Sequence, residues 1–166
     1  MAVIRGRLPF LLHYRKGPFP VSQSTVLDAI PHRPPFLFID DVTSITDDKI
    51  EAKVTLPVDL DVFRGHYPHF PIFPGVLTCE AVFQAGAILL SRRVTDPAAG
   101  VPALTRIRDA RFKRMVRPGE TLTLTAEIEE VLSSAFYMKG SAFVDGETAV
   151  RVLFTCALAP LPKERR

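Results

Sequence analysis

The stretch GHYPHFPIFPGVLTCEAVFQAGAILL, residues 65–90, decides the fold of this chain. Its first ten residues contain three prolines, and residues 59–74 as a whole are too proline-rich for regular structure. From Gly75 to about Ser91 the chain is apolar on nearly every face of a helix. Such a helix has to be surrounded by protein, and a curved sheet is the available wrapper.

The sequence on both sides of this helix supplies the sheet. Alternating or continuous apolar residues predict two strands before the helix and four after it. The pair Asp145–Gly146 is a strong hairpin signal between the last two strands. A short capped helix precedes all of them and ends at Pro31. We therefore predict an α+β fold, with a curved antiparallel sheet wrapped around one long central helix. The predicted strands are residues 36–42, 49–58, 104–116, 121–131, 134–144 and 148–158.

Length and composition fit one soluble globular domain. The chain has 166 residues, of which 47% are hydrophobic and 23% are charged, so it can bury a substantial core. No apolar run reaches the roughly 20 residues that a membrane-spanning helix needs. The expected organisation is a basic N-terminal extension at 1–20, the domain at 21–159 and a tail at 160–166.

The charge is basic but modest, at +3 from 21 basic and 18 acidic residues. Much of the excess lies between Arg106 and Arg117, a run that only Asp109 interrupts. The small total charge and the apolar neighbourhood argue against a nucleic-acid binder, whereas a smaller acidic partner fits better. Each arginine taken singly remains compatible with the solvated face of a strand.

Two cysteines, Cys79 and Cys156, both lie in apolar runs. This placement is typical of small buried thiols and not of a disulfide framework or a metal site. Buried thiols favour a reducing compartment, so we expect a cytoplasmic protein.

The start of the long helix is the first candidate for chemistry. The first amides of a helix lack internal partners and carry the positive end of its dipole, so Gly75 and Val76 predict a site for a carbonyl or oxyanion. The prolines of the preceding loop would hold His66 at a fixed offset from those amides.

Glu80 is the second candidate, because it lies among apolar residues in the same helix. A carboxylate there is costly unless it is paired, neutral or employed. Gln84, four residues on, shares its face and is placed to hold it by a hydrogen bond. His66 and Glu80 thus form a candidate base and acid, suited to removing a proton alpha to a carbonyl while a beta group leaves.

Two other interpretations of these residues, a metal site and a cysteine nucleophile, are possible but weaker. His66, His69 and Glu80 together contain metal-ligand types, but they lack the helical H-E-x-x-H spacing, so no metal is predicted. A nucleophilic Cys79 is disfavoured because the neighbouring Glu80 would raise the pKa of its thiol. A lone histidine in a loop is more often structural than catalytic, and His69 is interpreted that way.

Four segments extend this reading: LDAIPHRPPFLFIDDV, GHYPHFPIFPGVLTCEAVFQAGAIL, DARFKRMVRPGETL and VDGETAV. In this order they resemble the β-hydroxyacyl-(acyl-carrier-protein) dehydratases of the FabZ type, over about residues 24–158. The most specific feature is GHYPHFPIFPG followed by a glutamate fourteen residues after its first histidine. The resemblance implies the hot-dog fold, which agrees with the curved sheet and central helix predicted above.

The resemblance also implies an activity and roles. The reaction would convert a (3R)-3-hydroxyacyl thioester on acyl-carrier protein to the trans-2-enoyl thioester, with no cofactor. His66 matches the histidine that removes the alpha proton, and Glu80 matches the carboxyl that protonates the departing hydroxyl. Gly75 and Val76 match the amides that bind the thioester carbonyl, and Gln84 matches the residue that supports the carboxylate.

The same resemblance implies partners. In the family the histidine and the glutamate meet across a homodimer interface, and trimers of such dimers are common. An acyl tunnel and a basic carrier-protein surface are further expectations. The tunnel residues are Phe70, Ile72, Phe73, Leu77 and Phe83, and the carrier-protein residues are Arg111, Lys113, Arg114 and Arg117.

Besides its basic extension, the chain departs from the family pattern at two places. His69–Phe70 stands where relatives often have glycine and lysine, which makes the loop bulkier. Residues 103–105 are Ala-Leu-Thr where relatives often carry a tunnel-gating aromatic, so the preferred acyl length is left open. An acyl-thioesterase and a non-catalytic acyl-binding protein on the same fold are the alternatives.

Overall fold

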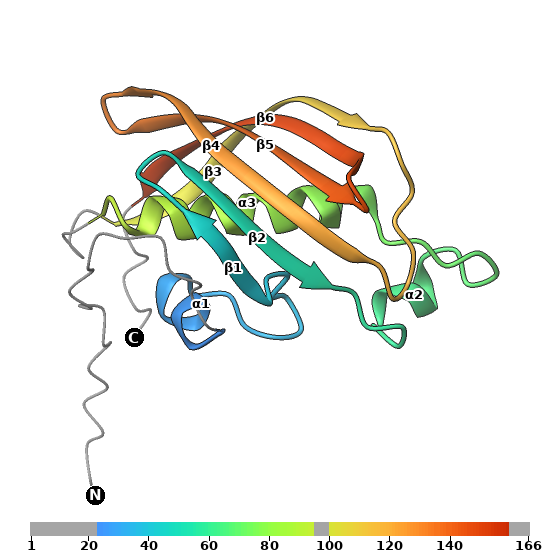
Figure 1. Ribbon diagram of the computed structural model, residues 1–166. Helices are drawn as coiled ribbons and strands as arrows, with labels where there is room; N and C mark the ends of the chain where they lie inside the picture. The colour runs from blue at the N-terminus through green and yellow to red at the C-terminus, as the bar shows by residue number, and fades with distance from the viewer. Residues whose placement is uncertain (1–22, 95–99, 160–166) are drawn as a thin grey trace, which may run out of the picture.

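Helix α3 (Gly75–Ser91) is the axis of the fold, and the sheet curves around it (Figure 1). The computed structural model describes residues 23–94 and 100–159, so the predicted extension at 1–20 and tail at 160–166 lie outside the described residues. Eleven of the seventeen residues of α3 are buried, and the residues that are not buried include Val76, Glu80, Ala87 and Ser91, which share one side of the helix. The prediction of a wrapped apolar helix with these bounds is confirmed.

The sheet has six antiparallel strands in the order β1-β2-β4-β5-β6-β3 in the described part of the chain. Two strands precede α3 and four follow it, so the predicted α+β architecture is confirmed. The strands are β1 (Asp41–Ile45), β2 (Lys49–Thr55), β3 (Val101–Phe112), β4 (Thr121–Leu132), β5 (Ala135–Val144) and β6 (Glu147–Ala159).

Alternation along the strands builds the inner face. On β2 the residues Ile50, Ala52 and Val54 are buried, and each is directly paired with an inward residue of β4. The predicted hairpin between β5 and β6 is confirmed, because Asp145 and Gly146 have φ values of +51° and +79°. Both angles fit a tight turn whose twist matches its strands.

The prediction for residues 36–42 is wrong, because the strand begins only at Asp41 and runs to Ile45. Phe38 and Ile39 are buried as expected, but Phe36 is 48% exposed. The reason lies in the long helix: Gln84 accepts the amide hydrogen of Phe38 and donates to the carbonyl of Phe36. A side chain thus replaces a neighbouring strand as the hydrogen-bond partner of this segment.

The loop before α3 also contains more structure than predicted. Helix α2 (Val62–Gly65) makes one turn, which ends where the amide of His66 donates to the carbonyl of Val62 at 2.9 Å. The turn is allowed because the first proline of the loop comes only at Pro68. A first helix, α1 (Gln23–Ala29), precedes the sheet as expected.

Strand β3 forms one end of the described sheet and pairs only with β6 there. Two register shifts, between Leu104 and Arg106 and between Arg108 and Arg111, change its alternation. As a result Leu104, Ile107 and Phe112 pair with the buried β6 residues Cys156, Phe154 and Val150 and share their face of the sheet. These three apolar side chains are nevertheless 41%, 51% and 55% exposed. Among the described helices, none is long and apolar enough to cross a membrane.

Candidate active site

The imidazole ring of His66, at the end of α2, is held by a hydrogen bond. Its Nδ1 lies 2.9 Å from the carbonyl oxygen of Ile72, across the proline loop. A carbonyl can only accept, so Nδ1 carries the hydrogen and Nε2 presents its lone pair. The loop is fixed in turn by a 2.7 Å hydrogen bond from the amide of Phe73 to the carbonyl of Val116. This is the orientation that the predicted role of His66 as a base requires.

The start of α3 lies beside that base. The carbonyl of Pro74 accepts from the amides of Leu77 and Thr78, at 2.9 and 3.0 Å. The two preceding amides, of Gly75 and Val76, have no acceptor within the helix. A side chain at Gly75 would meet the ring of Phe112, whose Cδ1 would lie 2.6 Å from a Cβ. The glycine therefore lets Phe112 approach the helix start closely.

These elements enclose a hollow of about 520 Å³, which we name the His66 hollow. It contains the predicted base and both predicted amides, so the structure brings these three together. Glu80 is not among the residues that line it. The lining residues are His66, Ile72, Phe73, Pro74, Gly75, Val76, Thr78, Phe112, Lys113, Arg114, Met115, Val116, Ala149 and Val150.

Glu80 is held as predicted by Gln84, whose Nε2 donates to its Oε1 at 3.0 Å. The same Nε2 also donates to the carbonyl of Phe36, and Oε1 of Gln84 accepts from the amide of Phe38. Both polar atoms of this side chain are therefore hydrogen-bonded within the core, where Gln84 is only 1% exposed. The side chain of Glu80 itself is 22% exposed. The carboxyl is therefore oriented from within the core and open to one side.

His32 is a neighbour of Glu80 that the sequence reasoning missed. Its Nε2 lies 3.7 Å from Glu80 Oε1, within the distance of an ion pair. The residues are 48 positions apart, and His32 lies in an irregular segment whose motif PHRPPF had no assigned role. Only the fold places this segment against α3.

The predicted tunnel residues divide into two groups. Ile72 and Phe73 line the His66 hollow, while Phe70, Leu77 and Phe83 do not. Phe83 is buried against Phe154 of β6, with ring centroids 4.9 Å apart. Phe70 is 53% exposed and lies under the guanidinium of Arg117, at 5.8 Å.

The four predicted carrier-protein residues are also separated. Lys113 and Arg114 line the His66 hollow. Arg114 donates two hydrogen bonds to the carboxylate of Glu120 and one to Glu147, and these carboxylates raise the pKa of its guanidinium. Arg111 pairs instead with Asp109 at 2.8 Å on another face.

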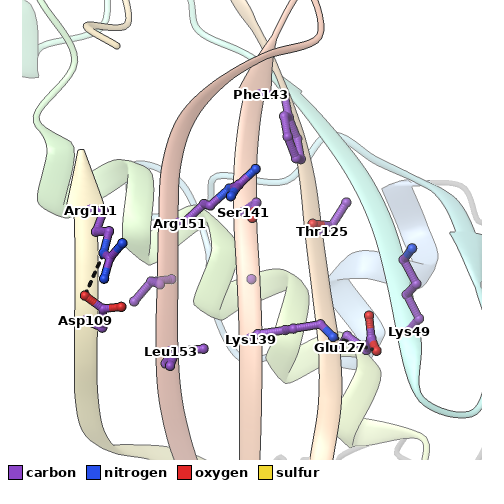
Figure 2. Close-up of a pocket in the computed structure, with 12 residues that line it drawn as sticks. Lys49, Asp109, Arg111, Thr125, Glu127, Lys139, Ser141, Phe143, Arg151 and Leu153 are labelled. Carbon is purple, nitrogen blue, oxygen red and sulfur yellow. Dashed lines mark hydrogen bonds and ion pairs between the residues drawn. The ribbon is translucent and has the colours of Figure 1, made fainter. Parts of the chain in front are cut away.

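That other face is the outer side of the sheet, which Figure 2 shows with side chains that lie on it. It contains a second hollow of about 450 Å³. We name it the outer trough; Asp109, Arg111, Glu127, Lys139 and Arg151 are among its lining residues. Lys139 pairs with Glu127 and Arg111 with Asp109, so most of its charges are neutralised by neighbours. It contains none of the predicted acid–base residues.

The cysteines are buried and unpaired, as predicted. Burial raises the pKa of the Cys79 thiol to about 11, and it does the same for Cys156. Neither thiol is an activated nucleophile at neutral pH. Among the described residues, no group of three His, Cys, Asp or Glu side chains lies close enough to hold a metal ion.

A sheet curved around one buried helix defines a protein of the hot-dog fold. Its candidate site combines an oriented histidine at the helix start with a held carboxyl in the second turn of that helix. The family model of the FabA-like domain matches residues 30–152. The chain therefore belongs to the FabA-like family.

Two relatives show how far the similarity extends. The chain is 40% identical over 124 residues to the 3-hydroxyacyl-[acyl-carrier-protein] dehydratase FabZ of Clostridium perfringens, covering 75% of this chain and 88% of the relative. It is 40% identical over 139 residues to the FabZ of Aromatoleum aromaticum, covering 82% and 96%.

Solved structures share the fold at lower identity. The dehydratase heterocomplex ApeI:P from Xenorhabdus doucetiae superposes with a TM-score of 0.68 at 16% identity, covering 90% of this chain and 94% of that one. A hypothetical thioesterase with coenzyme A from Streptococcus pneumoniae TIGR4 has a TM-score of 0.58 at 10% identity, covering 74% and 87%. The fold alone thus serves more than one chemistry.

Proposed function

We propose that this protein is a 3-hydroxyacyl-[acyl-carrier-protein] dehydratase of fatty-acid or related lipid synthesis. The observation that carries the proposal is the pairing of Nδ1 of His66 with the carbonyl of Ile72, because it leaves Nε2 as a base beside the free amides of α3. Relatives 40% identical are named for this reaction.

In the proposed mechanism the thioester carbonyl accepts hydrogen bonds from the amides of Gly75 and Val76, which stabilise the charge that develops on its oxygen. Nε2 of His66 takes the proton from the alpha carbon. The electron pair of that C–H bond becomes the new double bond as the beta C–O bond breaks. The hydroxyl takes a proton from Glu80 and leaves as water. Transfer of the alpha proton from His66 back to Glu80 closes the cycle.

The proposed mechanism needs a second copy of the chain, because Glu80 does not line the hollow that contains His66. The uncovered apolar face of β3 supplies the contact. Leu104, Ile107 and Phe112 lie on the helix side of the sheet, yet they are 41%, 51% and 55% exposed, although the ring of Phe112 lies against the helix start at Gly75. Antiparallel addition of a second β3 to this edge would extend the sheet and bury these residues. We infer a homodimer, which can assemble further into a trimer of dimers.

The proposed carrier-protein contact is narrower than the sequence prediction. Lys113 lines the His66 hollow, and Arg117 lies above the ring of Phe70. An acyl chain would be delivered at this place. Arg114 is occupied by Glu120 and Glu147, and Arg111 lies in the outer trough. An acidic carrier protein, presented in the cytoplasm, would thus meet Lys113 and Arg117 first.

The test of the reaction is hydration of a short trans-2-enoyl thioester, followed by loss of its conjugated absorbance. We expect reversible hydration by the native protein, a loss of about 100-fold or more in His66→Ala and in Glu80→Gln, and no released thiol. Thiol release without hydration would replace the proposal with a thioesterase. Acyl binding without either reaction would show a non-catalytic protein.

The test of the carrier surface compares two charge reversals. Lys113→Glu combined with Arg117→Glu is expected to raise KM about tenfold for the carrier-linked substrate and to leave KM for a short free thioester unchanged. Arg111→Glu is the matched control, with neither KM changed. An equal effect of Arg111→Glu would place the carrier on the outer trough instead.

A further inference from the structure

Among the described residues, the polar side chains of Gln84 and His32 contact Glu80, and the mechanism above gives His32 no part. Its side chain is 29% exposed, and its ring stacks on Phe36 with centroids 6.4 Å apart. The guanidinium of Arg33 donates to the carbonyls of His32, Ile30 and Leu27, at 2.7 to 2.9 Å. The segment that carries His32 is therefore pinned at several points, and the ring is held in one place.

The two ring nitrogens of His32 have different surroundings. Nε2 points toward Glu80, with 3.7 Å to Oε1. Nδ1 is fully buried and has no hydrogen-bond partner among the described residues. A bare buried acceptor is less costly than a buried N–H without an acceptor, so the neutral ring places its hydrogen on Nε2. The N–H dipole then faces the carboxyl of Glu80.

Glu80 is consequently held from one side. Gln84 donates to Oε1 at 3.0 Å, and the Nε2 hydrogen of His32 approaches the same oxygen. No described residue makes a hydrogen bond to Oε2. We propose that His32 is a positioning residue, which together with Gln84 fixes Oε1 and leaves Oε2 to exchange its proton with the substrate. This inference rests on the proposed function for its kinetic consequence, although the contact itself does not.

Kinetics of paired variants give the first arm of the test. His32→Ala is expected to lower kcat by about 10- to 100-fold with KM changed less than about threefold, because binding groups are untouched. His32→Gln retains a donor and should recover most of that loss. In the Glu80→Gln background His32→Ala should add less than about a twofold loss, because its effect passes through Glu80.

The matched control is His69→Ala, since His69 is exposed and outside the hollow. Melting temperatures of all variants separate misfolding from misplacement. The inference is overturned if His32→Ala keeps the native kcat, or if it lowers kcat by the same factor in both backgrounds. It is also overturned if His32→Gln is as slow as His32→Ala while both melt like the native protein.

The second arm needs no activity. The chain has four histidines, so the ring nitrogens of an ¹⁵N-histidine sample can be assigned by single substitutions. We expect the Nε2–H tautomer for His32 and a shift of its Nε2 resonance in Glu80→Gln. Unchanged resonances, or the Nδ1–H tautomer, would overturn the contact. An inactive native protein with the expected resonances would instead refute the proposed function and leave the contact standing.

Discussion

Gly140 of β5 shows how closely α3 lies against the sheet. A Cβ at this position would overlap Cγ1 of Val82 on the helix, and it would lie 2.9 Å from the carbonyl oxygen of Thr125 on β4. One of these neighbours is backbone in a paired strand and cannot swing aside. Because Gly140 has no Cβ, α3 can pack this closely against the sheet.

The residue-scale prediction is that Gly140→Ala lowers the free energy of unfolding by about 2–4 kcal/mol, because the overlap forces α3 or β4 to shift. Chemical denaturation of the purified protein measures this. The control is Gly65→Ala, where a Cβ would meet nothing within 4 Å and stability should change by less than about 1 kcal/mol. Equal stability of the two variants would contradict the prediction.

At the scale of elements, the turn between β3 and β4 is held by charge. Arg114 after β3 donates to both oxygens of Glu120 before β4, at 2.8 and 2.9 Å, and the amide of Arg117 adds a third bond at 2.7 Å. The hydrogen bonds from Arg114 hold the pKa of the Glu120 carboxyl below its ordinary 4.5. This turn also supplies Val116, the backbone partner of the His66 loop.

The lowered pKa of Glu120 determines how the stability of the fold changes with pH. A carboxyl whose pKa is lower in the folded state stabilises the protein above pH 4.5, and the contribution is lost as the pH falls through the folded pKa. Arg114→Met should therefore lower Tm by about 3–6 °C at pH 7, and the difference should shrink steadily below pH 4.5.

Thermal melts between about pH 3 and pH 8 would measure this difference in Tm, because that interval includes the pH range in which carboxyl groups titrate. Arg111→Met is the control, because the pair of Arg111 with Asp109 is 65% and 50% exposed and should shift Tm by less than about 1 °C. A difference between Arg114→Met and the native protein that stays constant down to pH 3 would assign the effect to packing and not to the carboxylate.

At the scale of the whole molecule, the edge strand β3 is the part of the fold that one chain leaves uncovered. The core around α3 is closed by one chain, but Leu104, Ile107 and Phe112 remain partly exposed, and Phe112 lines the His66 hollow. Uncovered apolar side chains at an unpaired sheet edge favour association with another strand.

We predict that Ile107→Lys converts a dimer to a monomer and abolishes hydration, because a buried lysine at the joined edges would lack a partner. Sedimentation velocity measures the mass and the enoyl assay measures the activity. Val131→Lys, which replaces an apolar residue on β4 that is 42% exposed, should change neither. An active monomer of Ile107→Lys would contradict the two-chain site.

The sequence by itself determined the wrapped helix, most strand positions, the hairpin at Asp145–Gly146 and the bond from Gln84 to Glu80. These features depend on neighbours within a few residues, such as apolar periodicity, turn chemistry and i,i+4 spacing on a helix. The resemblance to a known family added roles for His66 and Glu80, which spacing alone left among several readings.

Only the tertiary structure decided the rest. The segment 36–38 lost its predicted strand because Gln84, more than forty residues away, bonds its backbone. His32 meets Glu80, and Arg114 meets Glu147, through contacts that no periodicity encodes. The bulges of β3 likewise put three unevenly spaced apolar residues on one face. Such contacts join segments that are distant in sequence, so they become fixed only when the sheet closes around α3.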